Sequence, residues 1–283
     1  MIKGIRKDMK TKSVIINADD FGLSEEINKG IVQSFKKGIV TSTSLLVNRE
    51  GFEDAVIKIK QNPKLDIGIH LNIFRGKPLT KLSYIVNKKG RFLENQILFF
   101  LKYSINKKLF AKEASQEFEA QIKKAKMHKI KISHIDTEKH IHIFPEVMKA
   151  VIHIAKKYKI NAIRFPFESY ELPIKSDNSQ NLKNKISRIF YNKNIRILKA
   201  NNIKVTKFYG ISLSKNYSLK NLTIFLNCLK QGVTELSCHP GMNSKKSSYI
   251  DSYREQELKV LTSSKIKEEI NKNKIELTNF TRL

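Results

Sequence analysis

The 283-residue chain has few of the residues that mark several common protein classes. It contains no tryptophan and only two cysteines, Cys228 and Cys238, which are too few for a disulfide framework and lack a Cys-x-x-Cys spacing. This cysteine usage fits a reducing compartment. Prolines number six and glycines eleven, and no Gly/Ser/Pro-rich linker marks a domain boundary. We therefore expect one domain over residues 1–283.

Long apolar segments are also missing. The most apolar run, Ile97–Leu101, is far shorter than the roughly 20 residues that a membrane-spanning helix needs, and lysines follow it. The basic first twelve residues lead into the short run Val14–Ile16 and then into acidic residues, which does not match a signal peptide. A cytoplasmic protein without a membrane span is the simplest interpretation.

Acidic residues are scarce relative to basic ones, at 26 against 54, which gives a net charge of +28. A polyanionic partner such as nucleic acid, a membrane surface or an acidic glycan is one explanation. The other is a lysine-rich composition, because only nine of the basic residues are arginine, which phosphate and base recognition favour. Surface lysine improves solubility without a partner. We adopt the compositional explanation and expect no nucleic-acid partner.

Apolar runs of strand length alternate with helical patterns along most of the chain. The predicted strands are 13–18, 39–47, 65–71, 130–135, 161–165, 202–206, 232–237 and 275–280. Helices are predicted at 24–37, 51–61 and 111–128, after Pro145 and from about Ser263. Residues 74–110 interrupt the rhythm as an insertion, and 167–185 are predicted to form a loop. The alternation predicts a mainly parallel α/β sheet, either closed as a (β/α) barrel or open.

Polar side chains gather where the predicted strands end. Because carboxyl ends of parallel strands open onto one rim, residues distant in sequence are expected to converge there. These residues are Asp19 and Asp20 after the first strand, His70 on the third, His134 and Asp136 on the fourth, Arg164 on the fifth and His239 after the seventh. Two further histidines, His140 and His142, follow the fourth strand, so five of the seven histidines lie at or just after predicted strand ends.

Asp19 and Asp20 are adjacent carboxylates that repel each other unless a cation holds them. An exposed turn is the alternative interpretation. Because the pair follows the apolar run Val14–Ala18, we favour a functional role in which one carboxylate binds a metal and the other activates water.

The segment 134–142 contains three histidines and two acids in nine residues. Imidazole and carboxylate ligands suit Zn²⁺, Mn²⁺ or Mg²⁺. Not all of these side chains can bind one ion, so some must orient the others. A solvated charged loop is the alternative, and the interleaved Ile and Phe residues argue against it.

Arg164 can orient a carboxylate or bind a substrate oxygen, or it can form a structural ion pair. His239, before Pro240, is a candidate general acid for a leaving amine, or a turn histidine.

Five segments in order resemble the YdjC-like family, which includes chitooligosaccharide and hopanoid-pathway deacetylases. They are Asn17–Gly22, Thr41–Thr43, the Gly-x-His at 68–70, the His-x-Asp at 134–136 with its continuation at 140–145, and His239–Gly241. The resemblance covers about residues 13–280. It implies an irregular (β/α) barrel related to polysaccharide deacetylases, and a divalent metal.

The resemblance also implies residue roles. Asp19 would be the catalytic base, supported by Arg164, and His239 the acid. Asp20 and His70 would bind the metal. Many members place a histidine where this chain has Glu138, and the harder glutamate ligand favours Mg²⁺, with Mn²⁺ and Zn²⁺ as alternatives. Ligation by His140 instead is left open. The remaining candidates orient ligands or contact substrate: His134, Asp136, His140, His142 and Glu168.

The resulting hypothesis is a metal-dependent hydrolase that removes the acetyl group from an N-acetylated amino sugar. The insertion and the loop 167–185 would shape the cleft, with Tyr84, Phe92 and Tyr170 available to stack on sugar rings. The rivals are a noncatalytic glycan- or polyanion-binding protein on the same scaffold and a metal phosphoesterase. A homodimer is left open.

Overall fold

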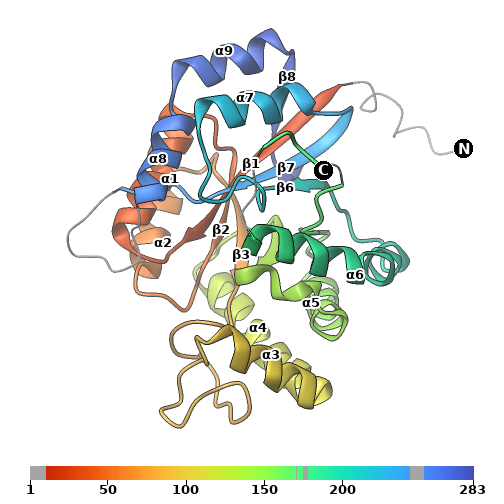
Figure 1. The fold of residues 1–283 in the computed structure, drawn as a ribbon. Coiled ribbons are helices and arrows are strands. Elements are labelled where there is room, and N and C mark those ends of the chain that lie inside the picture. The colour runs from red at the N-terminus through yellow and green to blue at the C-terminus, as the bar shows by residue number, and fades with distance from the viewer. Residues whose placement is uncertain (1–10, 170, 175–177, 243–251) are drawn as a thin grey trace, which may run out of the picture.

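The computed structural model describes residues 11–169, 171–174, 178–242 and 252–283. Its centre is an eight-stranded sheet in which all pairings between the described strands are parallel. The strands are β1 (Lys12–Phe21), β2 (Ser42–Leu45), β3 (Asp66–Leu71), β4 (His134–Thr137), β5 (Ala162–Ile163), β6 (Lys207–Tyr209), β7 (Gly232–Cys238) and β8 (Ile275–Thr278). The sheet runs in the order β5-β4-β3-β2-β1-β7-β6, and it curls, which confirms the expected irregular barrel-like α/β fold (Figure 1).

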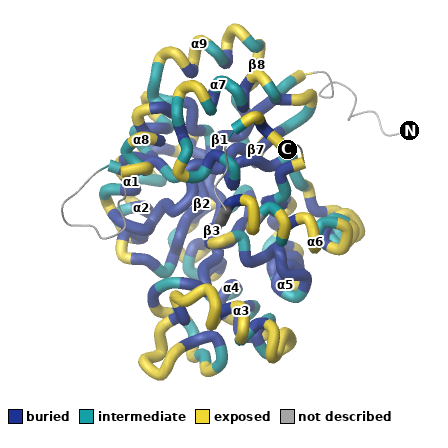
Figure 2. Tube along the Cα trace, viewed as in Figure 1, coloured by how far each residue is buried: buried dark blue, intermediate teal, exposed yellow. Residues whose placement is uncertain are grey.

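Helices surround this sheet (Figure 1). They are α1 (Glu25–Lys37), α2 (Phe52–Gln61), α3 (Gln96–Ile105), α4 (Lys107–Met127), α5 (Pro145–Lys157), α6 (Asn178–Ala200), α7 (Leu219–Cys228), α8 (Ser252–Leu261) and α9 (Ser264–Lys272). Buried residues gather along the strands and the inward helix faces (Figure 2). A parallel sheet requires such cover, because both of its faces are apolar.

The start of α1 shows how local sequence sets an element boundary. The Ser24 hydroxyl accepts a hydrogen bond from the Ile27 amide, as the predicted N-cap does. Glu25 and Glu26 lie in the first turn and Lys36 and Lys37 in the last, which complements the helix dipole.

β1 is the central strand and uses both of its edges. β7 pairs with residues 12–18 along one edge. The other edge is shared, because β8 pairs with residues 12–15 and β2 with residues 17–21. The C-terminal strand is therefore wedged beside the amino end of β1 and leaves the carboxyl end to β2.

Asp66, at the start of β3, fastens this amino end of the sheet. Its carboxylate accepts hydrogen bonds from the Ser42 and Ser133 hydroxyls at 3.0 and 2.9 Å and from the Phe280 amide at 3.0 Å. One buried acid thus joins β2, β3, the approach to β4 and the residues after β8.

The insertion was correctly placed but is more ordered than expected. It contains α3, and α4 begins at Lys107 rather than at residue 111. Phe92 is fully buried and the Tyr84 hydroxyl donates to the Lys102 carbonyl, so both rings serve packing; Tyr170 lies outside the described residues.

Two other predictions were wrong. The predicted loop 167–185 ends at Asn178, where α6 begins. The predicted strand 202–206 contributes only a bridge between Lys204 and Ala162, and the true strand β6 follows at Lys207.

Candidate active site

A polar cavity of 280 Å³ lies at the carboxyl end of the sheet. Side chains from several strand ends line it, including Asp19, Asp20, His70, Glu138, His140 and His239. These residues span more than 200 positions in the chain. Parallel strands bring them together because all their carboxyl ends lie on the same side.

A β-bulge lets two adjacent aspartates reach this one cavity. Successive side chains of a regular strand point to opposite faces. The register of β1 shifts between Ala18 and Phe21, and Asp20 adopts a left-handed backbone with φ of 71°. Bulges re-aim side chains in this way beside active sites. Asp19 and Asp20 therefore both line the cavity.

Arg164 is the hub beneath the cavity and is fully buried. Its Nη1 and Nη2 donate to Oδ2 and Oδ1 of Asp19, both at 2.7 Å, which is the paired geometry that fixes a carboxylate plane. Nη1 also lies 2.9 Å from Oδ2 of Asp136, and Nε donates to Glu235 at 2.6 Å. Asn17 Nδ2 also donates to Asp19 Oδ1, at 2.8 Å.

One guanidinium cannot neutralise three buried carboxylates. Burial raises the pKa of Glu235 to about 7, although Arg164 opposes the change. Burial also acts to raise the pKa of Asp136, but Arg164 and His70 outweigh it and hold that pKa well below its usual range. Glu235 is therefore about half protonated near pH 7, whereas Asp136 is ionised.

His70 is oriented by Asp136. The His70 Nδ1–H donates to Asp136 Oδ1 at 2.6 Å, and the Ser44 hydroxyl donates to the other oxygen at 2.7 Å. Burial acts to lower the pKa of His70, but the carboxylates of Asp136, Asp19 and Asp20 together outweigh burial. They raise this pKa to about 9. Nε2 faces the cavity, 3.8 Å from Asp20 Oδ1.

Asp20 has a second cationic neighbour. Arg254 on α8 donates to Asp20 Oδ2 at 2.5 Å. Burial raises the pKa of Asp20, but Arg254, His239 and His70 outweigh it and hold that pKa well below its usual range. Asp20 is thus ionised, with Oδ1 turned towards His70.

Glu138 lines the cavity from the turn after β4. Arg75 Nε is 3.5 Å from its carboxylate. Burial and the negative charge of Asp20 nevertheless raise the pKa of Glu138. The next two residues, Lys139 and His140, are both left-handed, with φ of 59° and 56°, and both line the cavity.

His239 follows β7 and also lines the cavity. Its Nε2 lies 3.9 Å from Asp19 Oδ2, and its side chain is 31% exposed, so a ligand can reach it. Its backbone N–H donates to Glu257 at 2.5 Å. Burial lowers the pKa of His239, and Asp19 and Asp20 offset this only in part. The neighbouring thiol of Cys238 is buried and does not line the cavity.

Five predicted residues do not line the cavity: Arg164 and Asp136, described above, and His134, His142 and Glu168. His134 begins β4 rather than ending it, and its ring stacks on Phe280 at 3.7 Å with both nitrogens near hydroxyls of Ser133 and Ser44. Burial lowers its pKa to about 4. The expected rim position of His134 was therefore wrong, because the strand begins four residues later than predicted.

His142 and Glu168 act on neighbouring backbone. His142 Nε2 lies 2.8 Å from the Arg164 carbonyl, and His142 Nδ1 lies 2.6 Å from Thr137 Oγ1. His142 therefore holds the backbone of Arg164 in place. Burial lowers the pKa of His142 to about 4, so its ring is neutral. Glu168 accepts hydrogen bonds from the Gly210 and Ser212 amides, both at 3.0 Å, and so holds a loop that lines the cavity.

Three contributors were missed by sequence reasoning. Glu235 is an acid inside the apolar strand β7, and that contrast was an available signal. Ser44, which joins Asn17, His134 and Asp136, lies just after the noted Thr-Ser-Thr segment. Arg254 carried no signal, because nothing in the pattern of α8 places it near Asp20.

Among the described residues, the buried group Asp19, His70 and Asp136 offers ligand atoms that all lie within 4.8 Å of one another. Such a group could hold a divalent cation.

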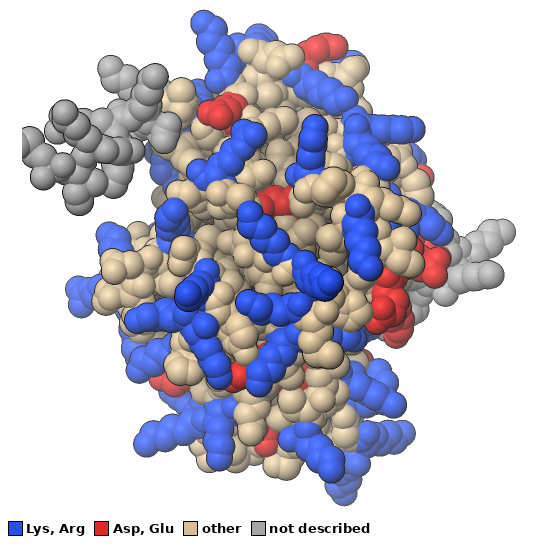
Figure 3. Space-filling view, turned by 180° about the vertical axis from the view of Figure 1, so that it is seen from behind, with Lys and Arg blue, Asp and Glu red and all other residues tan. Residues whose placement is uncertain are grey.

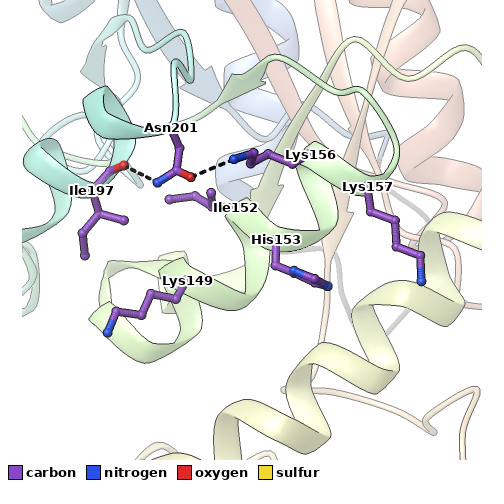
Figure 4. A pocket seen from close by; sticks show the side chains of 7 residues that line it. All are labelled: Lys149, Ile152, His153, Lys156, Lys157, Ile197 and Asn201. Carbon is purple, nitrogen blue, oxygen red and sulfur yellow. Dashed lines mark hydrogen bonds between the residues drawn. The ribbon is translucent and has the colours of Figure 1, made fainter.

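A second hollow, of 530 Å³, lies between α5 and α6 and is remote from these carboxylates. Its Lys149, His153 and Lys157 side chains point outward and apart (Figure 4). Asn201 bridges Lys156, at 3.2 Å, and the Ile197 carbonyl, at 2.9 Å (Figure 4). No converging polar group marks a reaction centre among the residues drawn there.

Known proteins resemble this chain over nearly its whole length. Residues 13–272 match the model of the family described as YdjC-like protein. A carbohydrate deacetylase of Clostridium beijerinckii is 33% identical, with 94% of this chain and 98% of the relative covered. A carbohydrate deacetylase of Brevibacillus brevis is 30% identical, with 95% and 99% covered.

A solved structure shares the fold. It is a protein of Enterococcus faecalis V583 named as a candidate cellobiose-phosphate cleavage protein, with a TM-score of 0.78, 24% identity, and coverage of 96% of this chain and 99% of that one. The family match and the deacetylase relatives together show that this chain belongs to the YdjC-like family.

Proposed function

We propose that this protein is a carbohydrate deacetylase that hydrolyses the acetamide of an N-acetylated amino sugar with the help of a divalent metal. The observation that carries the proposal is the convergence of Asp19, Asp20, His70, Glu138 and His239 on one cavity. Relatives at 30 to 33% identity that bear the deacetylase name support the reaction class.

We assign the metal to Asp20, His70 and Glu138. His70 presents Nε2 to the cavity while Asp136 holds Nδ1, the usual arrangement of a metal-bound histidine. The raised pKa of Glu138 results from burial near Asp20, and a cation would relieve that repulsion. Two carboxylates and one imidazole suit Mg²⁺ or Mn²⁺ better than softer ions, with Zn²⁺ as the alternative.

The group Asp19, His70 and Asp136 is a weaker candidate for that ion. Both oxygens of Asp19 already accept hydrogen bonds from Arg164, and Asp136 is bonded to Arg164, His70 and Ser44. The Arg164 guanidinium already supplies the positive charge that a metal ion would provide to these two carboxylates. Asp20 keeps one oxygen turned to the cavity, because Arg254 bonds Oδ2 while Oδ1 faces His70 Nε2 at 3.8 Å.

The chain's own residues supply the proton transfers. A divalent ion in this site would make water more acidic and polarise the acetyl carbonyl. Asp19, held in plane by Arg164 and Asn17, takes the proton from the attacking water. His239 donates a proton to the departing amine. Its lowered pKa makes the protonated imidazole a stronger acid, although less of it is present at neutral pH.

Acetate release tests this function. Chelator-treated protein is incubated with N-acetylated mono- and oligosaccharides, with and without Mg²⁺, Mn²⁺ or Zn²⁺. We expect metal-dependent acetate release from at least one sugar. Phosphate release from sugar phosphates without acetate release would instead assign a phosphoesterase, and sugar binding without any turnover would assign a noncatalytic binding protein.

A further inference from the structure

Helix α3 presents an apolar face to solvent. Ile97, Leu101 and Ile105 are 80%, 51% and 70% exposed, and Leu98 beside them is 39% exposed. Residues four apart lie one above the other on a helix, so the first three form a stripe. Single exposed apolar residues are common, but a continuous stripe of this kind marks an interaction surface.

The opposite side of α3 anchors the helix to the body of the protein. Phe99 and Tyr103 are buried, and their rings meet Phe110 of α4 at 4.9 and 5.5 Å. The Tyr103 hydroxyl donates to Glu146 of α5. With this side fixed, the stripe of Ile97, Leu101 and Ile105 stays exposed to solvent. Helix α3 itself lies at the lower end of the molecule (Figure 1).

The sequence segment that carries α3 is more one-sided in charge than the whole chain. Residues 74–112 contain one acid, Glu94, which pairs with Arg91. They contain ten basic residues: Arg75, Lys77, Lys81, Lys88, Lys89, Arg91, Lys102, Lys107, Lys108 and Lys112. The whole chain has 54 basic and 26 acidic residues, about two to one. Figure 3 shows basic side chains dominating the rear of the lower end as well.

We propose that the α3 face, defined by Ile97, Leu98, Leu101 and Ile105, docks the protein on an anionic lipid bilayer. A short helix with an apolar face and flanking lysines lies in the plane of a membrane interface, where apolar burial and attraction to anionic lipid act together. No helix in the described part of the chain is long and apolar enough to cross a membrane. Contact at the surface is therefore the geometry that α3 permits.

A second copy of this chain is the less suitable occupant. Pairing two α3 faces would bring together two copies of segment 74–112, each with ten basic residues and one acid in its sequence. Like charges across an interface oppose association, whereas anionic lipid complements them.

Vesicle co-sedimentation tests the proposal. The full chain is mixed with vesicles of phosphatidylcholine alone or with added phosphatidylglycerol, at low and high salt. We expect binding to the anionic vesicles only, weakened by salt. The double variant Ile97→Gln/Leu101→Gln should bind at least about tenfold more weakly, since two large side chains no longer enter the interface. The matched control is Ile57→Gln on α2, which is 55% exposed but outside this face, and it should bind as the wild type does.

Three results would overturn the proposal. The first is equal binding to neutral and anionic vesicles. The second is unchanged binding of the double variant, with its thermal midpoint confirming an intact fold. The third is a dimer in sedimentation velocity that the double variant dissociates, which would assign the face to a second copy.

Discussion

At the scale of single residues, the site is held together by two cationic side chains that are each shared between buried carboxylates. Arg164 contacts Asp19, Asp136 and Glu235, and His70 shares Asp136. A buried charge is tolerated only when it is paired, so each member of this cluster is held in place by the others. The proposed cation is placed instead beside Asp20 and Glu138, where Asp20 Oδ1 and His70 Nε2 face each other at 3.8 Å.

Asp19→Asn tests the proposed base. The amide keeps the size of the side chain but cannot accept a proton from water. We expect acetate release to fall about 10²- to 10⁴-fold. Asp54→Asn on α2, whose carboxylate bonds Lys58 and Asn28 away from the cavity, is the matched control and should remain active. Turnover that survives in a folded Asp19→Asn protein would remove the base assignment.

Glu235→Gln tests the charge balance. Because burial raises the pKa of Glu235 from its ordinary 4.5 to about 7, the folded state holds this proton more tightly than the unfolded state. The wild type therefore loses stability between these two pH values and no further above them. Relative to the wild type, Glu235→Gln should gain roughly 3 kcal/mol over this window. Urea unfolding at about pH 4.5 and pH 8 measures the gain, and an offset independent of pH would contradict it.

The residue types of the cavity were predictable from sequence, but their contacts were not. The Asp-Asp pair after an apolar run, His70 and His239 all line the cavity as expected. His134 and His142 fit the same pattern and yet have both ring nitrogens engaged by neighbours. Spacing shows which strand end a residue is near, whereas the direction of its side chain depends on where the strand starts and on neighbours from other strands.

At the scale of elements, α4 organises the insertion through two buried acids. Glu113 accepts hydrogen bonds from the backbone amides of residues 83–85, and Glu117 from those of Leu79 and Thr80. Burial raises the pKa of Glu113, but these amides outweigh it and lower the pKa. Charge-assisted hydrogen bonds to two carboxylates of α4 therefore hold the insertion against this helix.

Glu113→Gln should loosen this insertion. A neutral amide has one acceptor oxygen and leaves at least one of three backbone N–H groups without a good partner, at a cost of about 1–3 kcal/mol. Hydrogen exchange should accelerate at residues 79–86 and stay unchanged in β1. The matched control is Glu119→Gln on the same helix, whose carboxylate pairs with Lys123 and Lys157 and accepts a hydrogen bond from the Tyr158 hydroxyl, all outside the insertion. Equal exchange in both variants would contradict the proposed role.

Element boundaries were predictable where local chemistry marks them. Ser24 and Pro145 begin α1 and α5 as expected. α6 was taken for a loop at its start because Asn178 follows a polar segment without apolar periodicity. The strand expected at 202–206 has the right composition, but only Lys204 meets a partner strand, and that partner is not visible in local sequence.

At the scale of the whole molecule, the parallel sheet is what makes a site possible. Asp19 and His239 are 220 positions apart, and their side chains approach to 3.9 Å because β1 and β7 are paired neighbours. Asp66 fastens the other end of the sheet, so the strand ends that carry the site keep their relative positions. Alternation alone predicted a mainly parallel sheet, closed or open, and the family resemblance implied the barrel-like closure. The parallel sheet was enough to expect these residues at one rim.

The most direct measurement is a metal reconstitution titration. Chelator-treated protein receives increasing equivalents of Mn²⁺ or Mg²⁺, and acetate release from an N-acetylated saccharide is recorded for the wild type and for Glu138→Gln. We expect no acetate without metal, a plateau at one equivalent for the wild type, and a much higher metal requirement for the variant. Full acetate release in the presence of chelator, or identical titrations for both proteins, would contradict a single cation held by Asp20, His70 and Glu138.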